Sequence, residues 1–326
     1  MPVDIHDHMH DHIHVNENAL VKKDDHRQMK QMFAGGLSAA LTRTASQPLD
    51  VLKVRFQLQI EPVKETKTST ISKYRSISHA VSTIYKEEGF LALWKGHNPG
   101  QVLSIMFGIA QFWSFEQFKL IAKEQEYLKN SPNAVNFICG AFSGGIATFC
   151  AQPLDVLRTR LIAQDHGEGY RNSFHGMSNI IKTEGIRGLY RGINPSLIQI
   201  MPLMGTNFMV YKMLKDVIAK TLKIDPVEIP SLALMIIGGI SGTVSKTIVY
   251  PFDLVKKRLQ IQGFHKHRKT FGKNVEYNSI LHCFRLTVAQ EGFLGLFKGM
   301  TPTLLKSGWV TALNFCFYDK IIDILH

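Results

Sequence analysis

The residues of this chain with the clearest chemistry are acids and bases that recur at a fixed spacing. The run PLDVLKVR at 48–55 returns as PLDVLRTR at 153–160 and as PFDLVKKR at 251–258. Each copy has an acid two residues after its proline and a base three residues after that acid. On a helix, residues three apart share a face but differ in direction. In a three-fold ring, each acid could therefore pair with the base of a neighbouring copy.

The proline in each copy predicts how these ends come together. Proline removes one main-chain hydrogen bond and kinks a helix, which draws the end beyond it towards a common axis. Ion pairs that water can reach stabilise a structure by only roughly 0–1 kcal/mol each. Pairs this weak suit a gate that opens and closes. The alternative interpretation is three ion pairs at helix ends with no gating role.

A second motif follows each copy of the first and establishes an internal repeat. It consists of Glu-Gly, four residues, and then an aromatic residue, a base and glycine, and it is found at 88–96, 184–192 and 291–299. Two linked motifs in three copies indicate tandem repeats of roughly one hundred residues. Each repeat predicts a long apolar helix, a loop, a short amphipathic helix and a second long apolar helix. We expect the short helices at about Tyr74–Lys86, Tyr170–Lys182 and Tyr277–Gln290.

Three segments are long enough to cross a membrane. Asn133–Leu154, Gly192–Tyr211 and Gly96–Phe115 contain no Asp, Glu, Lys or Arg. With a rise of about 1.5 Å per residue, each can span a hydrocarbon core of about 30 Å. Their Ser, Thr, Gln, Asn and Gly residues predict that one helix face lines water. The sequence therefore predicts an all-α membrane protein.

Composition excludes several other classes of protein. The formal net charge of +12 fits an anionic solute, anionic lipid or nucleic acid. No zinc-ligand set or RNA-binding signature accompanies that charge, so nucleic acid is not the expected partner. No nucleophile motif, phosphate-binding glycine loop or metal triad is present, so we expect no enzyme, cofactor or metal site. The histidines are densest in residues 1–28, which we interpret as a disordered tail. Metal binding there is the alternative.

The repeated runs closely resemble the signature of the mitochondrial carrier family, Pro-x-acid-x-x-base-x-base, and the resemblance covers the chain from about Met32 to Leu325. It implies six transmembrane helices in three pseudo-symmetric repeats, with three short helices on the matrix side. The repeats are expected at 29–126, 132–223 and 229–326. The resemblance also implies a monomeric, multi-pass protein of the mitochondrial inner membrane. Its central cavity would open alternately to the matrix and to the cytosol.

The same resemblance assigns two gates. For the matrix gate it implies the ion pairs Asp50–Arg158, Asp155–Lys256 and Asp253–Lys53. Gln57 and Gln260 occupy the family's glutamine-brace position, whereas Ile162 stands there in the second repeat, so two braces are expected. The cytosolic gate is less complete, with the expected residues Glu116, Lys119 and Asp319.

Equivalent positions of the three repeats predict a basic cavity. Five residues before each motif proline stand Arg43, Thr148 and Lys246, and seven residues after each base-Gly glycine stand Leu103, Gln199 and Lys306. The resemblance places these positions in the cavity near the bilayer midplane. Three are cations and none is acidic. We interpret the three cations as a clamp for a phosphorylated anion. The alternative is that they only balance the motif acids.

Other side chains, on the second long helix of each repeat, could bind an aromatic heterocycle. These are the amides Gln111, Asn207 and Asn314, which can donate and accept hydrogen bonds, and the ring of Phe107. Within the family, the segments 50–59, 94–99 and 253–260 resemble carriers of thiamine pyrophosphate. This implies import of that solute into the matrix in exchange for nucleotides. Carriers of adenine nucleotides, deoxynucleotides or coenzyme A, and a non-transporting adaptor, remain open alternatives.

The three short helices carry a further implication. Tyr74, Tyr170 and Tyr277 are in register and are expected to begin these helices. Exposed helix N-termini bind phosphate groups through free N–H groups. The family resemblance implies cardiolipin at these positions. Capping and packing alone would also explain the pattern.

Overall fold

The computed structural model describes residues 5–60, 73–124, 132–165, 167, 169–222, 225, 229–264 and 275–325. Within these ranges the chain forms helices and no strand. Side chains before Met29 are not described, so the predicted tail at 1–28 lies outside the described side chains.

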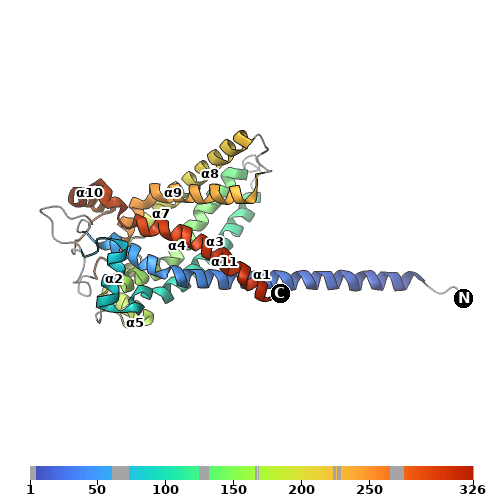
Figure 1. The fold of residues 1–326 in the computed structure, drawn as a ribbon, viewed down its shortest axis with the longest axis horizontal. Helices are drawn as coiled ribbons and strands as arrows, with labels where there is room; N and C mark the ends of the chain where they lie inside the picture. Colours follow the sequence, from blue (N-terminus) through green and yellow to red (C-terminus); the bar gives the residue numbers. More distant parts are fainter. Residues whose placement is uncertain are drawn as a thin grey trace. The chain divides into compact units, whose positions relative to one another are not determined.

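Three long helices carry the acid–base runs. They are α1 (Ile5–Leu58), α4 (Pro132–Ala163) and α9 (Ser231–Gln260), labelled in Figure 1. Each contains its motif proline inside the helix, at Pro48, Pro153 and Pro251. The helix continues beyond the proline, so the acid and both bases of each run lie on its last turns.

A second set of long helices follows the base-Gly motifs. These are α3 (His97–Glu124), α7 (Ile193–Ile198) with α8 (Ile200–Leu222), and α11 (Met300–Leu325). The predicted second long helix of the second repeat is divided into two, because the helix is interrupted at Gln199. Pro202 supplies no N–H to the carbonyl four residues earlier, and its ring crowds that carbonyl. The interruption therefore follows from the proline three residues beyond Gln199.

The three short helices begin later than predicted. They are α2 (Ile77–Glu88), α5 (Ser173–Glu184) and α10 (Ile280–Glu291). Each has an N-cap side chain that accepts a hydrogen bond from a main-chain N–H, supplied by Ser76, Asn172 and Ser279. Tyr74, Tyr170 and Tyr277 precede these caps and are buried, so the expectation that the tyrosines begin the helices is wrong.

Each short helix ends in a turn that only glycine adopts easily. Gly89, Gly185 and Gly292 have φ angles of 84°, 70° and 75°. One-turn segments follow, namely η1 (Phe90–Trp94), α6 (Ile186–Leu189) and η4 (Phe293–Phe297). The Glu-Gly motif is therefore the point at which the chain reverses from the short helix to the next long one.

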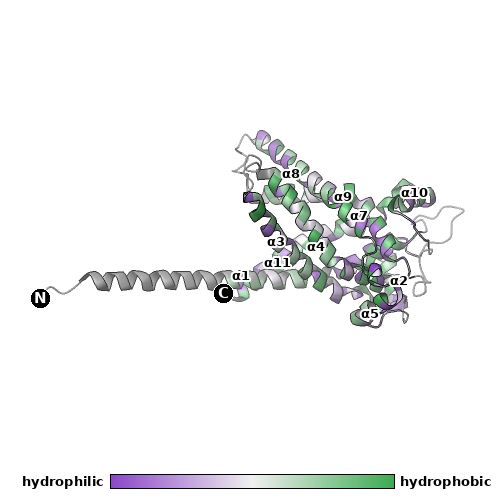
Figure 2. Cartoon of the chain, turned by 180° about the vertical axis from the view of Figure 1, so that it is seen from behind, coloured by the Kyte–Doolittle hydropathy of each residue, from purple (hydrophilic) through white to green (hydrophobic). Residues whose placement is uncertain are grey.

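Two of the described helices are long and apolar enough to cross a membrane by hydropathy alone. They are Ala134–Ala163 and Ala233–Gln260, and only 33% and 28% of their apolar windows are buried in the protein. Most of each window is therefore not buried, unlike that of a soluble core helix. On α3, exposed apolar side chains recur at helical spacing, at Val102, Ile105, Ile109 and Phe112. Figure 2 colours much of α4 and α9 green for hydrophobic residues.

The chain divides into two compact units. The first comprises Met1–Ser46 with Gly308–His326, where Ser38 Oγ lies 3.1 Å from Asn314 Oδ1. The second comprises Gln47–Ser307. In the second unit α3 packs against α4, and α8 packs against α9. Buried apolar residues gather where the short helices meet the proline-containing helices, for example Leu52, Tyr74 and Ile84.

Candidate functional site

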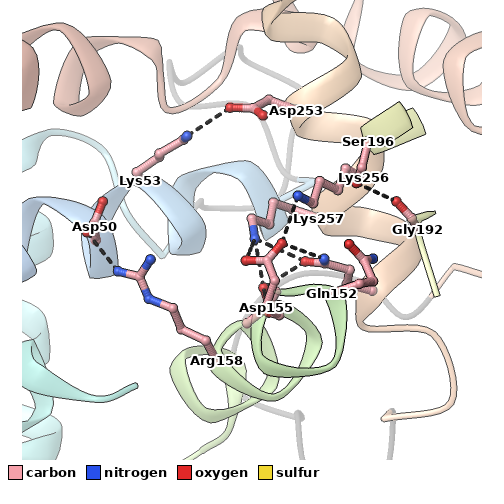
Figure 3. A network of polar contacts seen from close by, with 12 residues as sticks. Asp50, Lys53, Gln152, Asp155, Arg158, Gly192, Ser196, Asp253, Lys256 and Lys257 are labelled. Carbon is pink, nitrogen blue, oxygen red and sulfur yellow. Dashed lines mark hydrogen bonds and ion pairs between the residues drawn. The ribbon is translucent and has the colours of Figure 1, made fainter. Parts of the chain in front are cut away.

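The acids and bases of the three runs meet in the second unit. Arg158 Nη2 lies 2.7 Å from Asp50 Oδ2, Lys256 Nζ lies 2.8 Å from Asp155 Oδ2, and Lys53 Nζ lies 2.9 Å from Asp253 Oδ2. These are the three pairs implied by the family resemblance. Each links two different repeats, and Figure 3 shows them brought together from α1, α4 and α9. We refer to these six residues as the ion-pair ring.

Each acid of the ion-pair ring also has a second cationic partner. Lys306 Nζ lies 2.6 Å from Asp50 Oδ1, Lys257 Nζ lies 2.9 Å from Asp155 Oδ1, and Lys246 Nζ lies 3.0 Å from Asp253 Oδ2. Three carboxylates therefore face six cations. The charge excess marks this region as an anion-attracting site.

Two of these extra cations belong to the predicted clamp. The side chains of Lys306 and Lys246 are 28% and 33% exposed, against 8% for both Asp50 and Asp253. A solute could therefore reach the lysines more readily than the acids. Lys257 was missed by the sequence interpretation. Its only sequence signal was a base where the other repeats have Val54 and Thr159.

The glutamines at the brace position have different partners. Gln260 Nε2 donates to Asp155 Oδ2 at 2.8 Å and so contacts the ion-pair ring directly. Gln57 Nε2 donates instead to the Tyr250 hydroxyl at 3.1 Å. Ile162, which takes this position in the second repeat, is fully buried in an apolar cluster.

The second base of each run forms a buried ion pair within its own repeat. Arg55, Arg160 and Arg258 are 0–2% exposed. They donate to both carboxylate oxygens of Glu88, Glu184 and Glu291 respectively. The bases of the base-Gly motif, Lys95, Arg191 and Lys298, pair with the same three acids.

This arrangement explains why the two motifs recur together. A buried arginine needs a carboxylate, and the Glu-Gly motif supplies one from the end of the short helix. The sequence interpretation did not assign these residues. The signal that could have found them is that Glu-Gly and the second base occur in all three repeats without exception.

The base-Gly glycines bring neighbouring repeats into close contact. Gly96, Gly192 and Gly299 have φ angles of 73°, 74° and 82°. A Cβ on these glycines would lie 3.1, 2.9 and 2.8 Å from the carbonyl oxygens of Arg158, Lys256 and Lys53. Both the positive φ and the close approach require glycine. The turns that precede α3, α7 and α11 therefore each lie in close contact with a base of the ion-pair ring.

The remaining predicted solute contacts are distributed over both units. In the second unit Gln111 and Phe107 are half-buried and Asn207 is exposed. Gln199 is half-buried, and its Oε1 has no hydrogen-bond partner among the described residues. Arg43, half-buried, and Asn314, exposed, belong to the first unit. Lys246 and Lys306 therefore contact the ion-pair ring in the second unit, whereas Arg43 belongs to the first unit.

The predicted cytosolic gate forms no ion pair among the described residues. Glu116 is exposed, and Lys119 Nζ lies 5.5 Å from the centroid of the Phe115 ring. Asp319 is exposed in the first unit. No described group of His, Cys, Asp and Glu side chains could hold a metal ion.

A cavity of about 220 Å³ lies at the N-terminus of α10. It is lined by Gly192, which precedes α7, by Asn194 in the first turn of α7, and by Gln262, Asn278 and Ser279. Residues of the second and third repeats therefore meet around the N-terminus of α10. This cavity is large enough and polar enough to admit a phosphate group.

Comparison with known proteins agrees with this architecture. The family model for mitochondrial carrier proteins matches residues 24–126, 129–222 and 227–326. The chain is 38% identical to the mitochondrial thiamine pyrophosphate carrier of Bos taurus over 90% of its length and 92% of the relative. It is 33% identical to the mitochondrial thiamine pyrophosphate carrier 1 of Emericella nidulans, covering 93% and 94% of the two chains. It is also 33% identical to the mitochondrial thiamine diphosphate carrier 2 of Zea mays, covering 91% and 94%.

These matches extend over all three repeats and include both linked motifs. Carriers of this family are multi-pass proteins of the inner mitochondrial membrane, and they transport solutes rather than catalyse reactions. The chain belongs to the mitochondrial carrier proteins.

Proposed function

We propose that this carrier imports thiamine pyrophosphate into the mitochondrial matrix in exchange for nucleotides. The relatives from cattle, Emericella and maize are named for that solute, and they align with 90%, 93% and 91% of the chain. Within the chain, the observation that carries the proposal is the pair of partly exposed lysines, Lys246 and Lys306, beside the acids of the ion-pair ring. A diphosphate supplies the negative charge that these lysines attract.

We assign six membrane crossings to α1, α3, α4, α7 with α8, α9 and α11. The shorter ones, α3, α11 and α8, have 28, 26 and 23 residues, enough for a core of about 30 Å at 1.5 Å per residue. We assign the repeats to 29–126, 132–223 and 229–326, preceded by the tail at 1–28. A single chain supplies every member of the ion-pair ring, which favours a monomer as the working unit.

The solute-binding residues follow from the chemistry of the proposed solute. Lys246 and Lys306 would bind the diphosphate as point charges, and Arg43 would bind it through its planar fork. The free Oε1 of Gln199 can accept a hydrogen bond from the aminopyrimidine. Further contacts to the rings are assigned to Gln111, Asn207, Asn314 and Phe107.

The ion-pair ring would act as the matrix gate. With the ring closed, each acid is neutralised by two cations. An arriving diphosphate competes with Asp50 for Lys306 and with Asp253 for Lys246. It thereby removes one of the two partners of Asp50 and of Asp253 and weakens the ring. Opening the ring without an anion would leave unpaired charges partly buried, which is costly. This cost favours exchange over uptake without a counter-solute.

The outer gate and the lipid contacts complete the proposal. We assign the cytosolic gate to Glu116, Lys119 and Asp319, a weaker closure than the ion-pair ring. We assign the cavity at Ser279 to the phosphate groups of cardiolipin, which would link the second repeat to the third. The equivalent caps Ser76 and Asn172 are the positions for the other lipid contacts.

Transport by the purified protein tests the proposed function. Liposomes that contain the protein and unlabelled ATP should take up labelled thiamine pyrophosphate, and empty liposomes should take up little. A competition series with thiamine monophosphate, adenine nucleotides, deoxynucleotides and coenzyme A then ranks the solutes. Stronger competition by coenzyme A or a nucleotide than by thiamine pyrophosphate would overturn the substrate assignment. Exchange of none of these solutes would indicate an adaptor.

A further inference from the structure

The three pairs of the ion-pair ring are supported by different side chains. At the Asp155–Lys256 pair, Gln260 from the brace position donates to the acid at 2.8 Å. At the Asp253–Lys53 pair, Gln57 acts through Tyr250, whose ring centroid lies 5.9 Å from Lys53 Nζ. At the Asp50–Arg158 pair the brace position holds Ile162, which has no polar atom. One of the three pairs therefore lacks the expected support.

Another glutamine contacts this third pair from the opposite helix. Gln47 Oε1 accepts a hydrogen bond from Arg158 Nη2 at 3.1 Å. The same nitrogen donates to Asp50 Oδ2 at 2.7 Å. Gln47 Nε2 donates to the carbonyl oxygen of Lys95 at 3.0 Å, so the orientation of its amide is fixed from the other side. Gln47 is fully buried, which shields these bonds from water.

We propose that Gln47 is the third brace of the matrix gate and positions Arg158 against Asp50 in place of the missing glutamine at residue 162. This inference deepens the proposed function and rests on the gating role of the ion-pair ring. Gln47 acts through Arg158 and contacts no solute. It is therefore a positioning residue.

The residues around Arg158 are consistent with Gln47 taking the role of the glutamine that is missing at residue 162. Arg158 is the only arginine among the three bases of the ion-pair ring, and its guanidinium can direct N–H groups to two acceptors in one plane. A Cβ on Gly100 would lie 2.9 Å from Arg158 Nε and 3.3 Å from its Cδ and Cζ. At the equivalent positions of the other two repeats stand Ser196 and Thr303. Gly100 therefore makes room for the larger base that Gln47 can bind.

Comparison with the other repeats distinguishes the contact that Gln47 makes to Arg158 from a structural contact that all three repeats share. Gln152 and Tyr250 take the place of Gln47 before the other two motif prolines. Gln152 Nε2 donates to Arg191 O at 2.8 Å, and the Tyr250 hydroxyl donates to Lys298 O at 2.9 Å. The bond to the base-Gly carbonyl is therefore common to all three repeats. Among the described residues Gln152 Oε1 has no partner, so the second contact, to a base of the ring, distinguishes Gln47 from its counterpart.

Position 162 retains the shape of a brace site. A Cβ on Gly96 would lie 3.1 Å from Ile162 Cγ1. A Cβ on Gly192 would likewise lie 3.1 Å from Gln260 Cγ, and a Cβ on Gly299 would lie 3.1 Å from Gln57 Cγ. A glutamine at residue 162 would therefore begin in the same place as the two existing brace glutamines. This equivalence provides a rescue variant.

The test measures leak and exchange in the same liposomes. Leak is the efflux of labelled thiamine pyrophosphate without external solute, and exchange is its efflux with external thiamine pyrophosphate. Because loss of folded protein lowers both rates equally, their ratio reports how easily the gate opens without solute. Gln47→Leu should raise the ratio about tenfold, as expected for loss of a hydrogen bond to a charged group. Gln152→Leu, the matched control, loses the carbonyl bond only and should stay within about twofold of wild type.

Rescue provides the second arm of the experiment. Adding Ile162→Gln to Gln47→Leu should return the ratio to within about twofold of wild type. Equal ratios for Gln47→Leu and Gln152→Leu, or no change in the ratio when Ile162→Gln is added, would overturn the proposal that Gln47 is a brace. If Gln47→Leu is not recovered as folded protein, Gln47→Asn takes its place, because its shorter amide cannot reach both partners. If wild type exchanges another solute instead, the proposed substrate is wrong, and the same ratio is measured with that solute.

Discussion

Lys306 and Arg158 bind the two oxygens of one carboxylate. Lys306 Nζ lies 2.6 Å from Asp50 Oδ1, and Arg158 Nη2 lies 2.7 Å from Asp50 Oδ2. A residue predicted to hold the solute thus shares its partner with a residue predicted to close the gate. In the proposed mechanism, solute binding and gating are therefore linked by a single acid, without any intermediate residue.

The first prediction concerns Lys306 as a solute ligand. Lys306→Ala should lower exchange of thiamine pyrophosphate roughly 100-fold, because a charged partner of the diphosphate is lost. Lys306→Arg should retain part of the activity, since it keeps the charge but not its position. Initial exchange rates in liposomes measure both variants. Lys220→Ala, at an exposed position near the end of α8, is the control and should behave as wild type. Near-normal exchange by Lys306→Ala would remove Lys306 from the site.

The second prediction concerns the space that Gly100 leaves for Arg158. Gly100→Ala would place a methyl group 2.9 Å from Arg158 Nε and should displace the guanidinium from Asp50. We expect a fall in the melting temperature and a higher ratio of leak to exchange. Gly108→Ala is the matched control in the same helix, because a Cβ there meets nothing within 4 Å. Thermal unfolding in detergent compares the two, and equal melting temperatures would contradict the crowding argument.

The third prediction concerns the buried pair of Arg55 and Glu88. Glu88→Gln leaves the arginine, 1% exposed, without its charged partner, and should reduce the free energy of unfolding by about 3–5 kcal/mol. Glu87→Gln breaks the neighbouring pair with Lys73, in which the Glu87 side chain is 48% exposed, and should cost less than about 1 kcal/mol. Denaturant unfolding of both variants measures the difference. A small effect for Glu88→Gln would mean that the arginine finds another partner.

The fourth prediction is a pH dependence of that pair. Burial acts to raise the pKa of Glu88, but the hydrogen bonds and charge of Arg55, with those of Lys95, outweigh it and hold the pKa at about 2, against an ordinary value of 4.5. A lowered pKa contributes stability that is complete above 4.5 and is lost as the pH falls towards 2. The difference in melting temperature between wild type and Glu88→Gln should therefore be constant from pH 7 to about 5 and shrink below that. A difference that is unchanged at pH 3 would refute the assigned pKa.

The ion pairs were predictable because they depend on spacing that is repeated. An acid and a base three residues apart in three copies predict ion pairs between repeats, and the family resemblance implied the particular pairs of Asp50, Asp155 and Asp253. The long helices were predictable for a similar reason, since apolar runs and kinking prolines are local features. The late start of the short helices was missed, because the caps Ser76, Asn172 and Ser279 are single polar residues beside more conspicuous tyrosines.

The sequence by itself determined the three repeats, the helices and the identity of the charged residues, because each of these is encoded within a few turns of one segment. Only the tertiary structure decided which second cation each acid receives and that Gln47 supports Arg158. Except for Lys246 and Asp253, which lie on the same helix, those contacts join residues more than a hundred positions apart, as with Gln47 and Arg158 or Asp50 and Lys306. Their formation depends on how α1, α4, α9 and α11 converge, and no local spacing contains that information.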